Sequence, residues 1–112
     1  MSESTASQQL GKAILKKTRL PESVLQEADR IVATDRGNDY GHPLDDYTRT
    51  VNMFNALTGH HLSAEEGILF MVCVKLSREQ HKAKRDNRVD AAGYIKCLDM
   101  VLSEKTRRQT KA

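Results

Sequence analysis

The 112-residue chain is long enough for one domain and too short for two of ordinary size. Hydrophobic residues make up 38% of it, with two Phe, three Tyr and no Trp, so an aliphatic, helical core is favoured over a β-sheet. The net charge of +3 resides in the ends, because residues 1–20 and 104–112 each carry +3 and residues 21–103 carry −3. The acidic body argues against nucleic-acid binding as a function.

Three patterns bear on location and assembly. The longest apolar run, residues 68–74, is far shorter than the roughly 20 residues of a transmembrane helix, and the N-terminus lacks a secretory signal. Cys73 and Cys97 lie within apolar helical patterns, which is typical of small buried side chains in a reducing compartment. We expect a cytoplasmic protein with no membrane partner, and a homo-oligomer, since a small core gains from further burial.

The first part of the chain is expected to hold one helix and one turn. Residues 1–20 are expected to form a flexible basic segment. A helix is then predicted from Pro21 to about Thr34, since Pro suits a first helical turn. Its apolar residues repeat at helical spacing: Val24, Leu25, Ala28, Ile31 and Val32. The segment of residues 35–43, rich in Gly, Asp and Asn, is expected to end this helix in a structured turn.

Three more helices are predicted after this turn. The second begins near Pro43, and the third follows the capping-box pair Ser63 and Glu66. The third is so apolar that we expect it at the centre of the protein. The fourth is expected from about Asn87 to Ser103, followed by a flexible basic tail, residues 104–112. The prediction is an all-α bundle of about four helices, with its domain over residues 21–103.

A polar constellation accompanies the last two predicted helices. Lys75 interrupts the apolar third helix, and Arg78 follows one turn later on the same face. Asp86 and Asp90 stand four residues apart in the fourth helix. Asn87 can add an amide to this cluster, and Tyr94 a ring and a hydroxyl one turn after Asp90. Gly93, in a helix interior, indicates the close approach of another backbone or a ligand.

Two interpretations of this constellation stay open. In the first, a buried network of cations and carboxylates fixes the register of the helices. In the second, Lys75 and Arg78 bind the anionic oxygens of a phosphate while Asp86 and Asp90 hold Mg²⁺.

The turn before the second helix offers another candidate binding element. Gly37 and Gly41 can expose backbone N–H groups beside a helix N-terminus, where anions bind. Arg36, Tyr40 and His42 supply a cation, a stacking ring and a titratable donor. An ordinary tight loop is the alternative interpretation.

The order of these motifs resembles that of a known family. Asp35-Arg36-Gly37, Tyr40-Gly41-His42-Pro43, Lys75-Leu76-Ser77-Arg78, Asp86-Asn87, Asp90 and Gly93-Tyr94 are similar to motifs of small tailed-phage and prophage proteins, over roughly residues 22–102. The resemblance implies a phage-encoded protein acting in the cytoplasm of the infected bacterial host. It implies no activity.

A more distant resemblance is to the all-α nucleotide pyrophosphohydrolases of the MazG type. These are oligomeric helical bundles that use Mg²⁺ held by a Glu-Glu-x-x-Glu and a Glu-x-x-Asp motif. Here Asn87-x-x-Asp90 stands in place of the second motif, and Lys75 and Arg78 replace the glutamates of the first. This departure favours attraction of phosphate over metal binding.

Three hypotheses for function follow. The favoured one is binding or sequestration of a nucleotide or related phosphorylated small molecule on a MazG-like scaffold. The second is Mg²⁺-dependent pyrophosphohydrolysis of a nucleoside triphosphate. The third is a host-interaction or structural adaptor that binds no nucleotide, in which the charged cluster is purely architectural.

Overall fold

The computed structural model describes residues 21–111, except for the side chains of Asp35 and Arg36. The expected flexible segment over residues 1–20 lies outside the described residues. Within the described part the chain forms helices and no strand, which confirms the all-α prediction. The helical elements are α2 (Val24–Ile31), the π-helical turn η1 (Val32–Arg36), α3 (Gly37–Tyr40), α4 (Pro43–Thr58), α5 (Ala64–His81) and α6 (Arg85–Lys111).

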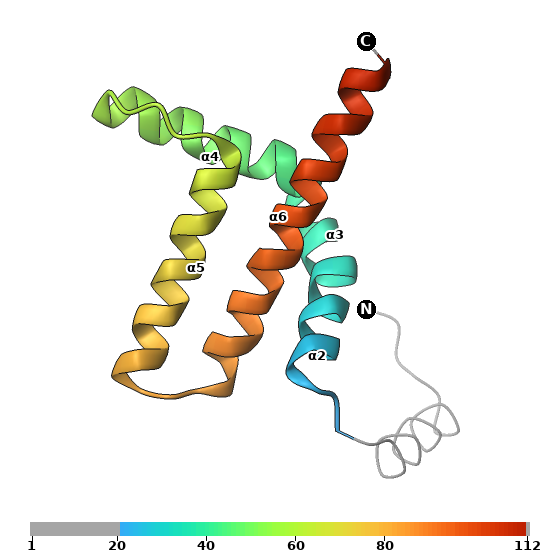
Figure 1. Cartoon of the computed structure of the whole chain (residues 1–112), viewed down its shortest axis with the longest axis vertical. Helices are drawn as coiled ribbons and strands as arrows, with labels where there is room; N and C mark the ends of the chain where they lie inside the picture. Colours follow the sequence, from blue (N-terminus) through green and yellow to red (C-terminus); the bar gives the residue numbers. More distant parts are fainter. Residues whose placement is uncertain (1–20, 112) are drawn as a thin grey trace, which may run out of the picture.

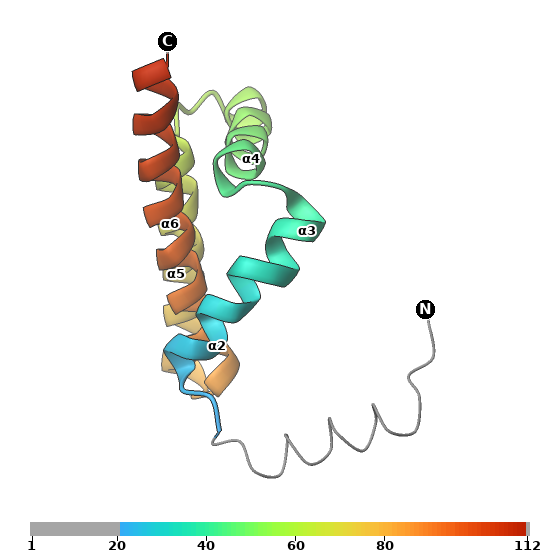
Figure 2. The same ribbon diagram turned by 90° about the vertical axis from the view of Figure 1, so that its right-hand side faces the viewer.

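The longest helix, α6, is the centre of the arrangement (Figure 1). It contacts α2, α4 and α5, whereas α2 and α5 have no contact with each other. Figure 2 shows α3 and α4 displaced to one side of α5 and α6. The α5–α6 pair therefore has an inner face, turned toward α4, and a rear face on which no described helix lies.

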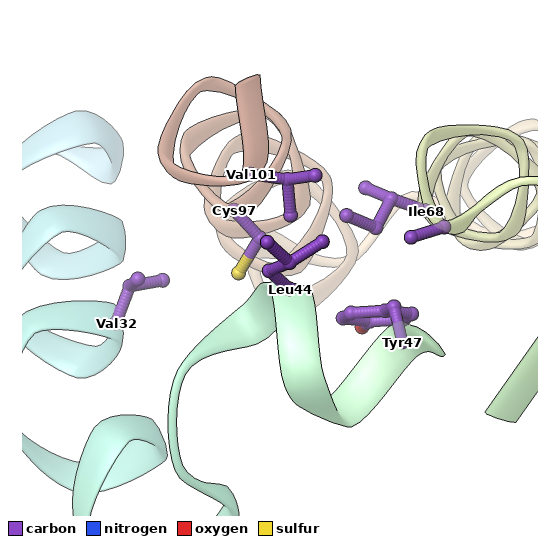
Figure 3. Packing of buried hydrophobic residues seen from close by; sticks show 7 residues of the cluster. Val32, Leu44, Tyr47, Ile68, Cys97 and Val101 are labelled. Atoms are coloured by element: carbon purple, nitrogen blue, oxygen red, sulfur yellow. The ribbon is translucent and has the colours of Figure 1, made fainter. Parts of the chain in front are cut away.

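The core lies between α4 and the inner face (Figure 3). Ile68 of α5 and Cys97 and Val101 of α6 are fully buried there. Leu44 and Tyr47 of α4 cover them. The core cluster is completed by Val32 of η1 and Ala64 of α5. Aliphatic and small side chains dominate, as the composition predicts.

Helix boundaries set by local capping are largely as predicted. Ser63 and Glu66 form the capping box at the start of α5: the Ser63 hydroxyl accepts the Glu66 N–H at 3.1 Å, and Glu66 accepts the Ser63 N–H at 3.0 Å. Pro43 is the first residue of α4. The first helix, however, begins at Val24 rather than Pro21, because a second capping box, between Ser23 and Gln26, sets its start.

The predicted stop near Thr34 is wrong, because helical backbone continues through η1 and α3 to Tyr40. The π-helical turn keeps the chain helical across residues 32–36. Gly37 has an ordinary right-handed helical φ of −62°. Gly41, with a φ of +77°, adopts the left-handed conformation that ends a helix.

Two further predictions about the helices need correction. α5 does not lie at the centre, since among the described elements it contacts α4 and α6 alone, and Cys73 on it is exposed rather than buried. α6 does not end at Ser103 but continues to Lys111, where Arg108 forms an ion pair with Asp45 of α4 at 3.0 Å. None of the helices described between residues 21 and 111 has the length and apolar character needed to cross a membrane.

Candidate functional site

The structure brings Lys75 of α5 and Asp90 of α6 together. Lys75 Nζ lies 2.9 Å from Asp90 Oδ2, and the side chains are 16% and 43% exposed. A lysine that is this little exposed needs a counter-charge, because desolvation of an unpaired ammonium is unfavourable. Asp90 supplies it, as the architectural interpretation expects, yet its own exposure leaves the pair accessible to a solute.

Arg78, the second predicted cation, lies one turn beyond Lys75 and is exposed. It lines a shallow groove at the α5–α6 connection together with His81, Lys82 and Lys84. The side chains of Arg78, Lys82 and Lys84 form no ion pair with any residue that the structure describes. This groove therefore concentrates positive charge beside the Lys75–Asp90 pair.

Glu79, which the sequence analysis did not identify, fixes the α5–α6 connection. It accepts the Lys84 N–H at 2.7 Å and the Asn87 amide at 3.4 Å, and it forms an ion pair with Arg88. The Lys84 N–H and then the Arg88 guanidinium hold the pKa of Glu79 below its usual value. Asn87 also donates to the Lys82 carbonyl at 3.4 Å, so its amide supports the turn. The sequence pattern that could have indicated this role is a single acidic residue, Glu79, just before a run of basic residues.

The two predicted metal ligands share one face of α6 but do not form a metal centre. Asp86 is exposed, and Asp90 contacts Lys75. Over the described residues, no three His, Cys, Asp or Glu side chains gather closely enough to hold one ion. Protein-bound Mg²⁺ prefers several oxygen ligands, and here Asp90 would have to release Lys75. This donor set does not fit the ion, and magnesium binding stays a prediction.

The Gly37–Pro43 segment lies away from the cations. His42 caps α4, its Nδ1 accepting the Leu44 N–H at 3.1 Å. Tyr40 is 54% exposed. The pocket beside His42 also includes Met100, which lies about 15 Å along α6 from Asp90, ten residues at 1.5 Å each. The structure therefore does not unite this turn with Lys75, and the Arg36 side chain lies outside the described part.

Tyr94 is in the predicted place, on the inner face one turn after Asp90. Its ring meets Tyr47 of α4 edge-to-face, with centroids 6.4 Å apart and planes at 80°. Tyr94 also borders two hollows. One of them, between α2 and α6, includes Asp90. The other lies between α4, α5 and α6.

This second hollow, here called the inner groove, is a feature that the sequence analysis missed. Its volume is about 430 Å³, in the range of small-molecule sites. Phe70 remains 65% exposed and Phe54 42% exposed along it. Only the crossing of α4 over α5 creates the groove, so the spacing of apolar residues could not reveal it. Its lining is Asp46, Tyr47, Thr50, Val51, Phe54, Leu62, Gly67, Phe70, Met71 and Tyr94.

The inner groove leads toward the cations along α5. Met71 lines it, and Lys75 follows one helical turn later on the same face. By helical rise, Lys75 lies about 6 Å and Arg78 about 10 Å beyond Met71 along the helix axis. On α6, Tyr94 and Asp90 repeat this order. The site thus has an aromatic part and a charged part, one turn apart.

Comparisons with known proteins give a family and one phage relative. Residues 23–102 match the family described as "Domain of unknown function (DUF6378)". The chain is 28% identical over 86 residues to the "Gene 55 protein" of Mycobacterium phage D29. The aligned region covers 76% of this chain and 57% of that protein. The chain thus spans less than two thirds of the relative's length. No solved structure matches. The phage relative agrees with the expected phage association, whereas a link to MazG-type enzymes stays a prediction.

Proposed function

Because the chain belongs to the DUF6378 family, whose description assigns no function, we propose one from the site itself: binding of a nucleotide or a related phosphorylated small molecule. The ring of the ligand lies in the inner groove, and its phosphate contacts Lys75 and Arg78. The observation that carries the proposal is the aromatic groove ending one helical turn from a little-exposed lysine.

The aromatic part suits a flat ring. Ligand sites are mostly apolar with a few polar groups that orient the ligand. Phe54, Phe70 and Tyr94 provide rings, and Asp46 and Thr50 add acceptors and a donor. Exposed aromatic faces such as that of Phe70 also gain from stacking on a nucleobase.

The charged part suits an anion. The charges of Lys75 and Asp90 cancel in their ion pair. Arg78 adds one positive charge, so the three side chains together are net positive. Arg binds phosphate through two parallel hydrogen bonds, and Lys binds it as a point charge. Lys82 and Lys84 strengthen the positive field around this end of the site.

The donor set favours binding over hydrolysis. The carboxylates near Lys75 do not form the cluster that a metal-activated water requires. We therefore propose sequestration of the ligand in the cytoplasm of an infected bacterium, rather than turnover.

Calorimetric titration with nucleoside mono-, di- and triphosphates and cyclic nucleotides, with and without Mg²⁺, tests this function. Lys75→Met and Phe70→Ala are each expected to weaken binding at least tenfold. Lys96→Met is the matched control, because it removes another Lys–Asp pair, with Asp29, away from the inner groove. It is expected to leave affinity unchanged.

Chromatography of the same mixtures separates the alternatives. An unchanged ligand pool supports binding, and Mg²⁺-dependent release of pyrophosphate would support the hydrolase hypothesis instead. No heat with any compound would refute both nucleotide hypotheses and favour an adaptor.

A further inference from the structure

The rear face of α5–α6 is apolar, and no helix described between residues 21 and 111 covers it. Leu76 is 56% exposed, and Ile95 and Leu102 are each 50% exposed. Helices normally bury such a stripe, and a contiguous exposed apolar patch marks an interaction site. We propose that a second copy of this chain covers the rear face and forms a twofold-symmetric dimer. By helical spacing the face consists of Leu69, Cys73 and Leu76 of α5 and of Ala91, Ile95 and Leu102 of α6, with Leu98, which also packs against the core cluster, at its border with α5.

The spacing on the rear face is that of helices packed against helices. On α6 the apolar residues follow one another at steps of four, three and four, and on α5 at steps of four and three. Alternating steps of three and four keep one seam along a helix turned toward a partner helix. Two hairpins joined in this way make a four-helix bundle from α5 and α6 of both copies.

The rear face is large enough for such an interface. α5 has 18 residues and is therefore about 27 Å long by helical rise. Two neighbouring helices with axes 8–10 Å apart present a face roughly 20 Å wide, so the flat area is about 500 Å². The accessible area of a ridged helical surface is larger than this flat projection, and a standard interface buries roughly 800 Å² per partner. Exposed Leu25 of α2, beside Ile95, extends the rear face.

The charges favour one orientation of the second copy. The end of the pair at the α5–α6 connection carries Lys82, Lys84 and Arg88, the last of which also pairs with Glu79 of its own chain, whereas exposed Asp99 lies toward the other end of α6. A parallel arrangement would place the basic ends of both copies together, and like charges repel. An antiparallel arrangement places each basic end over the opposite end of the second copy. Asp99 forms no ion pair with any residue between 21 and 111 for which a side chain is described.

One position of the twofold axis satisfies both helices. The twofold axis of an antiparallel dimer lies in the interface, at right angles to the helices. If it is level with the midpoint of Leu69 and Leu76, then Leu69 of one copy faces Leu76 of the other, and the reverse. An axis level with the midpoint of Arg88 and Asp99 does the same for this charged pair. The contact between Lys75 and Asp90 fixes the relative height of α5 and α6, and it brings the two midpoints level to within about one residue, or 1.5 Å. The rear face is thus self-complementary, as a twofold interface requires.

Sedimentation of the full chain over a range of micromolar concentrations tests the dimer. The wild type is expected as a dimer, and Ile95→Glu is expected to raise the dissociation constant at least tenfold, because it buries an unpaired carboxylate. Leu57→Glu is the matched control: Leu57 is 86% exposed on α4, away from the rear face, and its variant is expected to remain dimeric. Circular dichroism verifies that both variants are helical. A monomeric wild type would overturn the proposal, and it is the result expected if residues 1–20 take the place of a second copy. Equal loss of dimer in both variants would also overturn it.

A charge exchange tests the orientation. Asp99→Arg and Arg88→Asp are each expected to weaken the dimer, since each places like charges opposite one another. Because Arg88→Asp also removes the ion pair with Glu79 within the chain, circular dichroism and melting curves verify that each variant stays folded. The double variant restores the attraction, so its dissociation constant is expected to return toward that of the wild type. A double variant as weak as the single ones would exclude the antiparallel arrangement.

Discussion

Asp90→Asn removes the charge that faces Lys75 while the shape of the side chain is kept. Lys75 is only 16% exposed, so its ammonium is left mostly desolvated and without a counter-charge. Breaking a fully buried pair costs roughly 3–5 kcal/mol and an exposed pair contributes about 0–1 kcal/mol. For this intermediate burial, a loss of about 1–2 kcal/mol in the free energy of unfolding is expected.

Lys75→Met removes the other partner with a smaller expected effect. Asp90 is 43% exposed, so water solvates the remaining carboxylate, and the Met side chain keeps the apolar contacts of the lysine stem. The expected change is within about 0.5 kcal/mol. The double variant Lys75→Met, Asp90→Asn is expected to match Lys75→Met, because no unpaired ammonium remains.

Urea unfolding followed by helical circular dichroism measures these differences. Protein concentration is held constant, since dimerisation contributes to apparent stability. Lys96→Met and Asp29→Asn provide the control pair, with side chains 31% and 70% exposed, and both are expected to have small effects. A larger loss from Lys75→Met than from Asp90→Asn would refute the argument that desolvation of Lys75 dominates the pair.

Two further predictions concern helix packing and acid stability. A Cβ on residue 67 would lie 2.7 Å from Val51 Cγ1, so Gly67→Ala is expected to separate α4 from α5 and to lower the melting temperature. Gly93→Ala, whose nearest contact is 3.4 Å, is the control; a larger loss from it would contradict the role assigned to residue 67. The guanidinium of Arg107, followed by that of Arg108, lowers the pKa of Glu104 from 4.5 to about 2. Because this folded-state pKa is depressed, the stabilisation is present above about pH 4.5 and is lost as the pH falls toward 2. Melting curves of the wild type and Glu104→Gln are expected to converge over that range, and a constant difference would contradict this assignment.

Several parts of the fold follow from local signals. The Ser63–Glu66 capping box fixes the start of α5, and Pro43 begins α4, because these groups satisfy or remove the free N–H groups of a first turn. The Lys75–Asp90 pair is also within reach of the sequence. A short connection makes consecutive helices antiparallel, so charges near it face each other.

Other features depend on neighbours that the sequence does not display. Two glycines occur in the segment of residues 35–43, yet only Gly41 adopts a positive φ, and the helix continues through Gly37. The apolar content of α5 indicates burial, but it does not identify what covers each side: α4 and α6 cover Ile68, whereas Leu69 and Cys73 remain on the rear face.

The sequence by itself determined the helical class and most helix starts, and it brought Lys75 and Arg78 near Asp86 and Asp90, because capping, periodicity and the reach of a short turn act over a few residues. Which cation pairs with which carboxylate was decided by the structure. The tertiary structure decided that α6 is central, that Phe70 borders a groove and that Leu76 is exposed. These features depend on where α4 crosses the α5–α6 pair. That crossing is set by side chains far apart in the chain, such as Val51 against Gly67, whose contact no local pattern encodes.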